Sequence, residues 1–394
     1  MKRIFAKRTS AAVLAACTAA ALCGCSGTAA RTSEKSELPV VSADSETDSS
    51  QSTEGRFPTH ISQTLADRLK IDADVIFPEQ AETGTAETAS MADQTLWDRR
   101  NEIRGALIPD ADIGTMETNE DSAQGNLYLN CESADQQKYL VLDGSGNLLY
   151  TIGDLSTHVE NAIDTDQSFD TYNGDLYQTM ESLPFETKEA AWEQAKELMQ
   201  SIGITQVSDR YQCYVMDYQT MAEQEQKAAE QSEADFGKTL EVKTDWSEAD
   251  NCYYFQTQQA IDGCPVLPAY QGEGTDEYTI TAIVDQTGVI ELKLSGYYPL
   301  EESGTESVVT PETIVGAVQK YYDSVITEDT WTVDRMTLGI KIIGQSDDPK
   351  QAKTALAWNC EIMVTPAGSL SGTAAAPYPQ YVTFYADNAK VIPE

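Results

Sequence analysis

The sequence predicts an α+β protein in which antiparallel sheets are each packed with helices, and two tandem helix-on-sheet modules are one arrangement of these elements. Three observations support this fold class. Short β-rich runs meet at Gly-containing polar turns, which is typical of hairpins. Capped segments with apolar residues three or four positions apart indicate helices. The 394 residues, 41% of them hydrophobic, can bury more than one core.

Residues 1–24 are predicted to form a bacterial lipoprotein signal peptide. Basic residues precede an Ala-rich apolar run that is too short for a convincing membrane span. The run ends in Leu22-Cys23-Gly24-Cys25, which resembles a lipobox. In that pattern the cysteine receives a diacylglycerol, so we expect lipidation at Cys25. Leu14-Ala15-Ala16-Cys17 also matches, and an ordinary secreted protein is the other alternative.

Residues 25–55 are predicted to be a disordered tether. They are rich in Ser, Thr, Asp, Glu and Ala and hold almost no large apolar side chains, so burial cannot offset the entropy of ordering them. The lipid on the predicted cysteine would hold the protein at the membrane. Each methylene of an acyl chain adds about 0.8 kcal/mol of membrane affinity, so two chains anchor far more stably than one. We therefore expect a protein lipid-anchored to the cell membrane on its extracytoplasmic face.

The charge of the chain excludes one class of partner. There are 64 acidic and 26 basic residues, for a net charge of -38. Phosphate backbones and anionic lipid surfaces repel such a chain, so we expect no nucleic-acid partner. The acids can attract divalent cations or basic partners. They also suit an exported protein that is kept soluble by its charge.

Residues 56–185 are predicted to be an N-terminal α+β region. Its first apolar residues lie near helical spacing: Ile61, Leu65, Leu69 and Ile71. The elements expected after them are a strand at 75–77, a loop over 79–94, a helix over 96–107, a strand at 127–129, and a hairpin of strands 139–142 and 148–152. Residues 153–183 show no clear pattern.

Residues 186–300 are predicted to be a first helix-plus-sheet module. A helix over 187–202 begins at the N-cap Thr187 and ends before Gly203. A strand over 211–218 follows it. The polar residues 220–236 then form a solvated helix or a charged loop, and the helix is favoured. The remaining elements are strands in two hairpins, around Asp262-Gly263 and around residues 285–288.

Residues 301–394 are predicted to be a second helix-plus-sheet module. Its helix has Thr310 as N-cap and Pro311 at the first position. The apolar face of that helix consists of Ile314, Val315, Val318 and Tyr322. The expected strands are 336–343, 356–364 and 381–385.

The second module resembles PepSY-like modules and the accessory proteins of Gram-positive cell-wall sensor kinases. The resemblance rests on the capped helix, the Trp358-containing strand and the final strand ending at Asp387, with Tyr253-Tyr254-Phe255 adding to it. As a whole, the chain resembles uncharacterised clostridial lipoproteins of unknown function. The resemblance covers about half of the chain and brings no catalytic residues with it. It implies a regulatory or inhibitory role at the cell surface.

The sequence nominates no catalytic residue, no cofactor and no metal site. The two histidines, His60 and His158, are not part of a paired-His zinc motif, and no Gly-x-Ser-x-Gly elbow is present. Residues 143–147 partly resemble a calcium loop, but a plain β-turn explains them better, since Leu148 occupies the position that needs Gly. A solvated loop best explains the nearby acids: Glu160, Asp164, Asp166 and Asp170.

Five cysteines follow the lipidation site: Cys131, Cys213, Cys252, Cys264 and Cys360. An odd number leaves at least one free thiol, and buried free thiols are the simplest expectation. One disulfide, involving Cys213, is the alternative that an exported location permits.

The sequence leads to a functional hypothesis without a named ligand. We expect a membrane-anchored, non-enzymatic interaction or regulatory protein whose partner is a membrane or cell-wall protein. A solute- or glycan-binding lipoprotein is the alternative, and a hydrolase ranks third because no nucleophile or acid is nominated.

Overall fold

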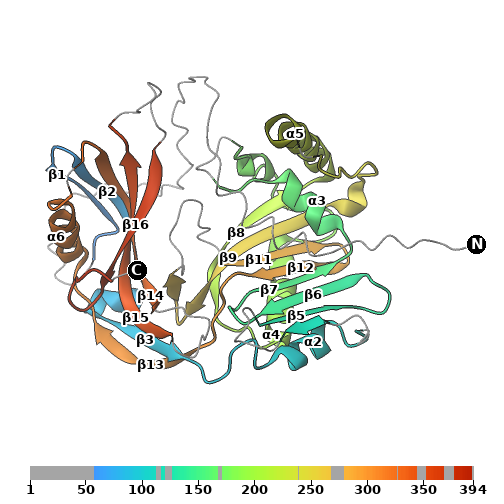
Figure 1. Cartoon of the computed structure of the whole chain (residues 1–394), viewed down its shortest axis with the longest axis horizontal. Coiled ribbons are helices and arrows are strands. Elements are labelled where there is room, and N and C mark those ends of the chain that lie inside the picture. The colour runs from blue at the N-terminus through green and yellow to red at the C-terminus, as the bar shows by residue number, and fades with distance from the viewer. Residues whose placement is uncertain are drawn as a thin grey trace, which may run out of the picture. The chain divides into compact units, whose positions relative to one another are not determined.

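Antiparallel strand pairing dominates the fold, and helices pack on the sheets, so the predicted α+β class is confirmed (Figure 1). The computed structural model describes residues 57–111, 117–119, 127–166, 171–237, 239–267, 279–325, 327–343, 352–367 and 377–392. These residues belong to one compact unit. The predicted signal peptide 1–24, the tether 25–55, and Cys17, Cys25 and Asp170 lie outside the described residues. No helix in the described part of the chain is long and apolar enough to cross a bilayer.

One half of the fold is an antiparallel sheet with the order β8-β9-β11-β12-β7-β6-β5-β4. Its strands are β4 (Glu117–Asn119), β5 (Tyr128–Glu132), β6 (Lys138–Asp143), β7 (Leu148–Ile152), β8 (Val207–Met216), β9 (Cys252–Ile261), β11 (Ile280–Asp285) and β12 (Gly288–Leu294). The predicted hairpins β6–β7 and β11–β12 are confirmed by their registers.

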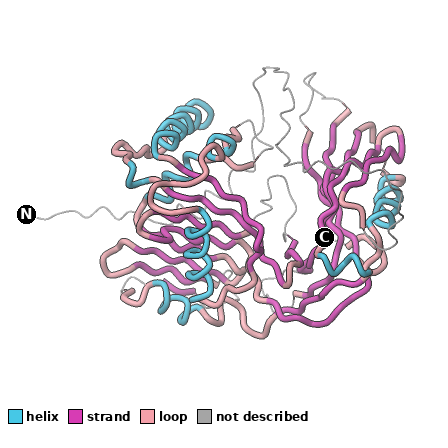
Figure 2. Tube along the Cα trace, turned by 180° about the vertical axis from the view of Figure 1, so that it is seen from behind, coloured by secondary structure: helices cyan, strands magenta, loops and turns pink. Residues whose placement is uncertain are grey.

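Helices cover both faces of this sheet. Helices α2 (Arg100–Leu107) and α4 (Lys188–Ser201) pack on one face, where Trp192 joins a core with Phe255. Helices α3 (Leu155–Ala162) and α5 (Tyr218–Phe236) pack on the other, where Tyr254 joins a separate core. Successive side chains of β9 point to opposite faces, so one strand contributes to both cores. Figure 2 shows α4 lying across the strands from behind.

The helices predicted over 187–202 and 220–236 are confirmed, and so are the two residues predicted to cap the first of them, Thr187 and Gly203. The Thr187 hydroxyl accepts a hydrogen bond from the backbone N–H of Ala190 at 3.3 Å. Gly203, at φ +74°, takes the left-handed conformation that follows a helix end. Helix α5 begins after Asp217, whose carboxylate accepts from the N–H of Thr220 at 3.0 Å. These side chains satisfy backbone donors that the first turn of each helix leaves without a partner.

The other half of the fold joins the beginning of the described chain to its end. The sheet there runs β1-β2-β14-β15-β16, with α6 packed against it. Its elements are β1 (His60–Ala66), β2 (Leu69–Ile76), α6 (Pro311–Tyr322), β14 (Thr330–Ile343), β15 (Lys353–Thr365) and β16 (Tyr378–Tyr385). A two-stranded ribbon of β3 (Thr85–Met91) and β13 (Leu300–Ser307) completes it. The four apolar residues predicted for α6 are buried, and Pro311 occupies the first turn.

The short strand β10 (Cys264–Leu267) joins the strands of the two halves into one continuous sheet. Cys264 pairs with Ile261 of β9 in antiparallel fashion, and Val266 pairs with Ile340 of β14 in parallel. A Cβ added to Gly339 of β14 would lie 2.6 Å from the carbonyl oxygen of Pro265. Only glycine allows this approach, so β14 needs Gly339 to reach β10.

The helical prediction for residues 61–71 is wrong, because β1 and β2 form an antiparallel hairpin there. In β2 the burial alternates strictly, with Leu69, Ile71, Ala73 and Val75 facing the core and charged residues facing out. This period of two is the signature of a half-buried strand. The spacing of Ile61 and Leu65, one on each side of a polar run, only imitates a helix.

Three further segments differ from what the sequence predicted. The expected loop over 79–94 contains the 3-10 turn η2 (Glu79–Thr83) and the strand β3. Its Ala and Thr residues are weak strand formers, and pairing with β13 determines the conformation. The unpatterned stretch 153–183 contains α3, a short helix stabilised by the burial of Val159 and Ala162. The helix expected over 96–107 begins at Arg100.

The predicted module ranges and the two main cores divide the chain differently. Residues 57–91, assigned to the region 56–185, share a core with residues 308–392 of the predicted second module. The core of the other half takes residues from 96 to 297, and so spans the predicted boundary at 185.

Candidate functional site: a cleft between two cores

A cleft of about 840 Å³ lies where segments from both halves of the fold meet. Its lining consists of residues 76–80, 205–210, 258, 260–263, 265 and 300–302. Ligand sites in proteins typically occupy about 300–1,000 Å³ and combine apolar walls with a few polar groups. This lining has that mixed character, with Phe77, Pro78 and Leu300 beside amides, hydroxyls and carboxylates.

One wall of the cleft is an irregular segment at the start of β8. Val207 pairs with Gln259 and Tyr211 pairs with Thr257, so β8 has two extra residues between these pairs. The hydroxyl of Thr257 donates to the backbone oxygen of Arg210 at 2.7 Å and holds this bulge against β9. Bulges re-aim side chains at the edge of a sheet, and here the bulged residues line the cleft.

A second wall is the turn between β9 and β10. Asp262 and Gly263 have φ values of +48° and +78°, and Ile261 pairs with Cys264 across them. This is the two-residue hairpin that Asp-Gly favours, because both central positions need positive φ. The hairpin predicted from these residues is therefore confirmed, and its tip places the Asp262 carboxylate on the cleft.

Two glutamine amides clamp the third wall in place. The side-chain oxygen of Gln206 accepts from the N–H of Leu300 at 3.0 Å, and its amide nitrogen donates to the oxygen of the same residue at 2.5 Å. Gln259 donates to the backbone oxygen of Tyr298 at 2.7 Å and to the Gln206 side chain at 3.1 Å. The clamp fixes the start of β13 against the other half, so the cleft has preformed walls.

Carboxylates outnumber cationic groups on the cleft. The acids in the lining are Glu79, Asp209, Asp262, Glu301 and Glu302, and the one cation among the lining residues is Arg210. The lining therefore carries an excess of negative charge. In a partly desolvated cleft these carboxylates together attract a positively charged ligand.

Three carboxyl groups converge beside the hairpin tip from three separate elements. Asp262 of the turn is hydrogen-bonded to Glu87 of β3 and to Glu302 of β13. These hydrogen bonds are the largest cause of the raised pKa values of both Glu87 and Glu302, and the neighbouring charges raise them further. The Oε2 atom of Glu87 is buried and has no hydrogen-bond partner. Desolvation raises the pKa of the buried Cys264 thiol to about 12, and the charge of Glu87 adds to this rise.

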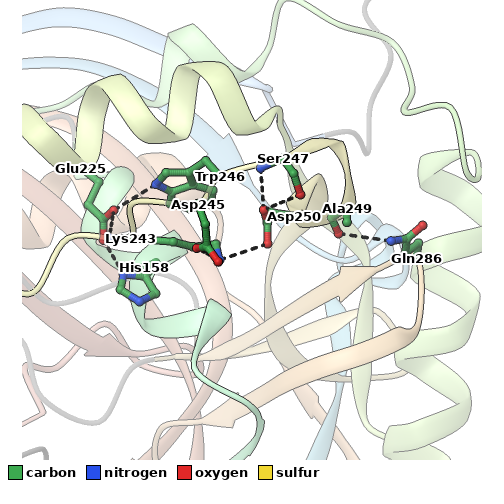
Figure 3. A network of polar contacts seen from close by, with 9 residues as sticks. All are labelled: His158, Glu225, Lys243, Asp245, Trp246, Ser247, Ala249, Asp250 and Gln286. Carbon is green, nitrogen blue, oxygen red and sulfur yellow. Dashed lines mark hydrogen bonds and ion pairs between the residues drawn. The ribbon is translucent and has the colours of Figure 1, made fainter.

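A second polar cluster lies away from the cleft, around Glu225 of α5 (Figure 3). This carboxylate is fully buried. One oxygen lies 2.6 Å from Nδ1 of His158, and the other accepts from the N–H of Lys243 at 3.0 Å and from the indole of Trp246 at 3.2 Å. The cluster is structural, since each oxygen of Glu225 is used to hold α3 and residues 243–246 against α5.

A chain of surface contacts extends from this cluster. The ammonium of Lys243 lies 2.6 Å from Asp245 and 3.6 Å from Asp250, and the Asp245 hydrogen bond is the main cause of its raised pKa. Asp250 also caps the 3-10 turn η5 (Glu248–Asp250) by accepting from the backbone and hydroxyl of Ser247 (Figure 3). These contacts order the segment that leads into β9.

The candidate residues from the sequence are not brought together. His60 is exposed on β1 and lies between Asp72 and Asp74, at 3.2 and 2.9 Å. His158 is in the Glu225 cluster. The Asp143 carboxylate accepts from the N–H groups of Ser145 and Asn147, so it closes the hairpin turn between β6 and β7.

The loop expected at the acidic residues is in part a helix, since Glu160 lies on α3 and pairs with Lys293 of β12 at 3.0 Å. The backbone N–H of Asp166 donates to the carboxylate of Asp164, which also accepts from the hydroxyl of Thr171. Within the described part of the chain, no group of acids, histidines and cysteines has the arrangement of a metal site.

The five cysteines that follow the predicted lipidation site are free thiols, and four of them are buried. Burial raises the pKa of each, to about 12 for the half-buried Cys213. A thiol with a raised pKa is mostly protonated at neutral pH and reacts slowly. The alternative of a disulfide at Cys213 is therefore not realised in this structure.

Sequence reasoning did not find the cleft. Its walls come from β2, β8, the β9–β10 turn and β13, which are far apart in the sequence. The Asp262-Gly263 hairpin was the one local signal among them, and it indicated a turn and not a site. The clamp residues Gln206 and Gln259 carry no recognisable motif.

Comparison with known proteins shows a shared fold and nothing further. No protein-family model matches the chain, and no curated protein matches it. The chain is similar to the crystal structure of an uncharacterized protein from Eubacterium rectale ATCC 33656, with a TM-score of 0.56 and 16% sequence identity. The match covers 86% of this chain and 94% of the other.

Proposed function

We propose that this protein is a non-enzymatic binding protein, held on the extracytoplasmic face of the cell membrane by a lipid on Cys25. Its ligand, or a segment of a partner protein, enters the cleft. The observation that carries the proposal is the cleft itself, which has the volume of a ligand site and walls preformed by the Gln206–Gln259 clamp.

The cleft supports an interaction role of the kind the resemblance to sensor-kinase accessory modules implies. Amide, hydroxyl and carboxylate groups in the lining suit recognition by hydrogen bonds, and Phe77 and Pro78 offer apolar contact. The same features suit a small solute or glycan, which is the second candidate. Both candidates use the cleft and differ in the ligand.

The anchor is tested by cell fractionation. Cys25→Ala is expected to move the protein from the membrane fraction to the medium, whereas Cys17→Ala is expected to leave it in the membrane. Release by Cys17→Ala alone would assign the lipid to Cys17. Retention of both variants would remove the lipid anchor from the proposal.

The role of the cleft is tested by blocking it. Ser208→Trp places a large side chain in the lining, and Ser307→Trp puts the same side chain on an exposed strand position outside it. The purified wild type is screened against peptide and glycan arrays. Captured ligands are expected to be lost with Ser208→Trp and kept with Ser307→Trp. A saturable hydrolytic activity that disappears on a single carboxylate substitution would show an enzyme and overturn the proposal.

A further inference from the structure

The acidic end of the cleft has the chemistry to recognise an organic cation. Asp262 and Glu302 line it, and Glu87 lies hydrogen-bonded behind them. Three carboxyl groups this close repel one another when ionised, so they hold protons or attract a positive charge. The buried Oε2 of Glu87 also lacks a donor, which leaves the group incompletely satisfied.

A metal ion is a poor match for this group. Calcium needs six to eight oxygens about 2.3–2.6 Å from one point, and magnesium needs a tighter octahedron. The described residues contain no cluster with such an arrangement. Here the acids stand side by side and bond to one another. Ammonium and guanidinium groups suit a row of carboxyl groups, because their N–H groups point in several directions and can donate hydrogen bonds to several carboxylate oxygens.

The rest of the lining fits the stem of a long cationic side chain. Phe77, Pro78 and Leu300 supply apolar surface in the same cleft. Lysine and arginine bury their methylene stems on such surface while the charged head reaches polar groups. The cleft volume of about 840 Å³ exceeds the needs of one side chain and leaves room for the adjoining peptide.

We infer that the cleft binds a peptide segment bearing lysine or arginine, with a cationic head group at the Glu87–Asp262–Glu302 carboxyls and its stem against Phe77 and Leu300. The inference rests on the proposed function and names the ligand class for the same cleft. A bound cation favours the ionised carboxylates, so binding opposes the effects that raise the pKa values of Glu87 and Glu302.

The test uses fluorescence polarisation with a labelled, end-blocked Ala-Lys-Ala-Lys-Ala peptide in 150 mM NaCl, which screens the diffuse charge of the protein. The peptide with Gln in place of Lys is the ligand control. Asp262→Asn with Glu302→Gln removes two charges from the cleft, and Asn keeps the positive φ of the turn. Glu306→Gln with Glu328→Gln removes two exposed charges outside the lining.

The Lys peptide is expected to bind the wild type and the Gln peptide is not. The cleft variant is expected to weaken binding at least 10-fold, and the control variant less than 2-fold. Spermidine is expected to compete only at concentrations well above those of the peptide.

Four results would overturn the inference. Equal binding by the cleft variant and the wild type would place the peptide elsewhere, and equal loss in both double variants would reduce it to diffuse charge. Ca²⁺ binding that excludes the peptide would show a metal site. If the Lys peptide fails while Ser208→Trp still abolishes capture of another ligand, the ligand class is wrong and the proposed function stands. If Ser208→Trp changes nothing either, the proposed function fails as well.

Discussion

The buried carboxyl group of Glu291 makes a sharp prediction about stability. Glu291 lies on β12 beneath α3, with 2% of its surface exposed, and its Oε1 has no hydrogen-bond partner. Desolvation, and then the nearby charge of Glu160, raise its pKa from the ordinary value of 4.5 to about 8. Hydrogen bonding to Ser156 and the charge of Lys293 oppose the rise. The folded protein therefore keeps Glu291 protonated at neutral pH.

The sign of the pH effect follows from proton binding. Between pH 4.5 and 8 the folded chain holds a proton on Glu291 that the unfolded chain has lost, so stability falls as the pH rises. The interval is about 3.5 pH units, and each unit corresponds to about 1.36 kcal/mol, which gives a loss of about 5 kcal/mol above pH 8. Relaxation around α3 makes this an upper figure.

Glu291→Gln keeps the shape of the side chain and removes the titration. We expect the variant and the wild type to unfold at similar urea concentrations at pH 4.5. At pH 8.5 we expect the variant to be more stable by several kcal/mol. The free energy of unfolding is measured by urea titration at four pH values, and the difference between the two proteins isolates Glu291 from other groups. Parallel pH profiles would refute the reasoning.

Three other predictions concern separate parts of the fold. The Asp74 hydrogen bond is the main cause of the raised pKa of His60, so in Asp74→Asn this histidine is expected to titrate closer to 6.5 by NMR, and an unchanged titration would contradict this. Because the pKa of His60 is raised in the folded protein, the pair stabilises the fold below pH 6.5, and this stabilisation is lost as the pH rises. Glu225→Ala is expected to cost about 3–5 kcal/mol in urea unfolding because three partners lose a buried acceptor, and a loss below about 1 kcal/mol would show that the cluster is dispensable. Gly84→Ala and Gly146→Ala each place alanine at a positive φ, which costs about 1–2 kcal/mol. Only at position 146 would the new Cβ also lie 2.4 Å from a backbone oxygen, so Gly146→Ala is expected to have a clearly lower Tm than Gly84→Ala. Equal Tm values for the two variants would disprove the close contact.

Local signals in the sequence predicted the elements that depend on local chemistry. Helix α4 has a capping Thr187 and a following Gly203, and the β9–β10 hairpin has Asp262-Gly263. Each of these motifs satisfies or shapes its own backbone, so its conformation is encoded within a few residues.

Elements that depend on distant partners were missed. Strand β3 is specified by β13, and helix α3 by the sheet beneath it, so neither has a strong pattern of its own. The cleft is the extreme case. Glu87, Asp262 and Glu302 become neighbours only through the tertiary fold, and a chain with 64 acidic residues offers no way to single them out beforehand.

The parallel pairing of β2 with β14 has a consequence for the order in which the protein folds. Leu69 lies beside Trp331, and Thr88 is hydrogen-bonded to Ser303, 215 positions away. Synthesis begins at the N-terminus, so β2 and β3 cannot pair with β14 and β13 until these later strands have been made, and long-range pairing of this kind is slow. Until β2 has paired with β14, the charges on its outer face disfavour pairing between two nascent chains.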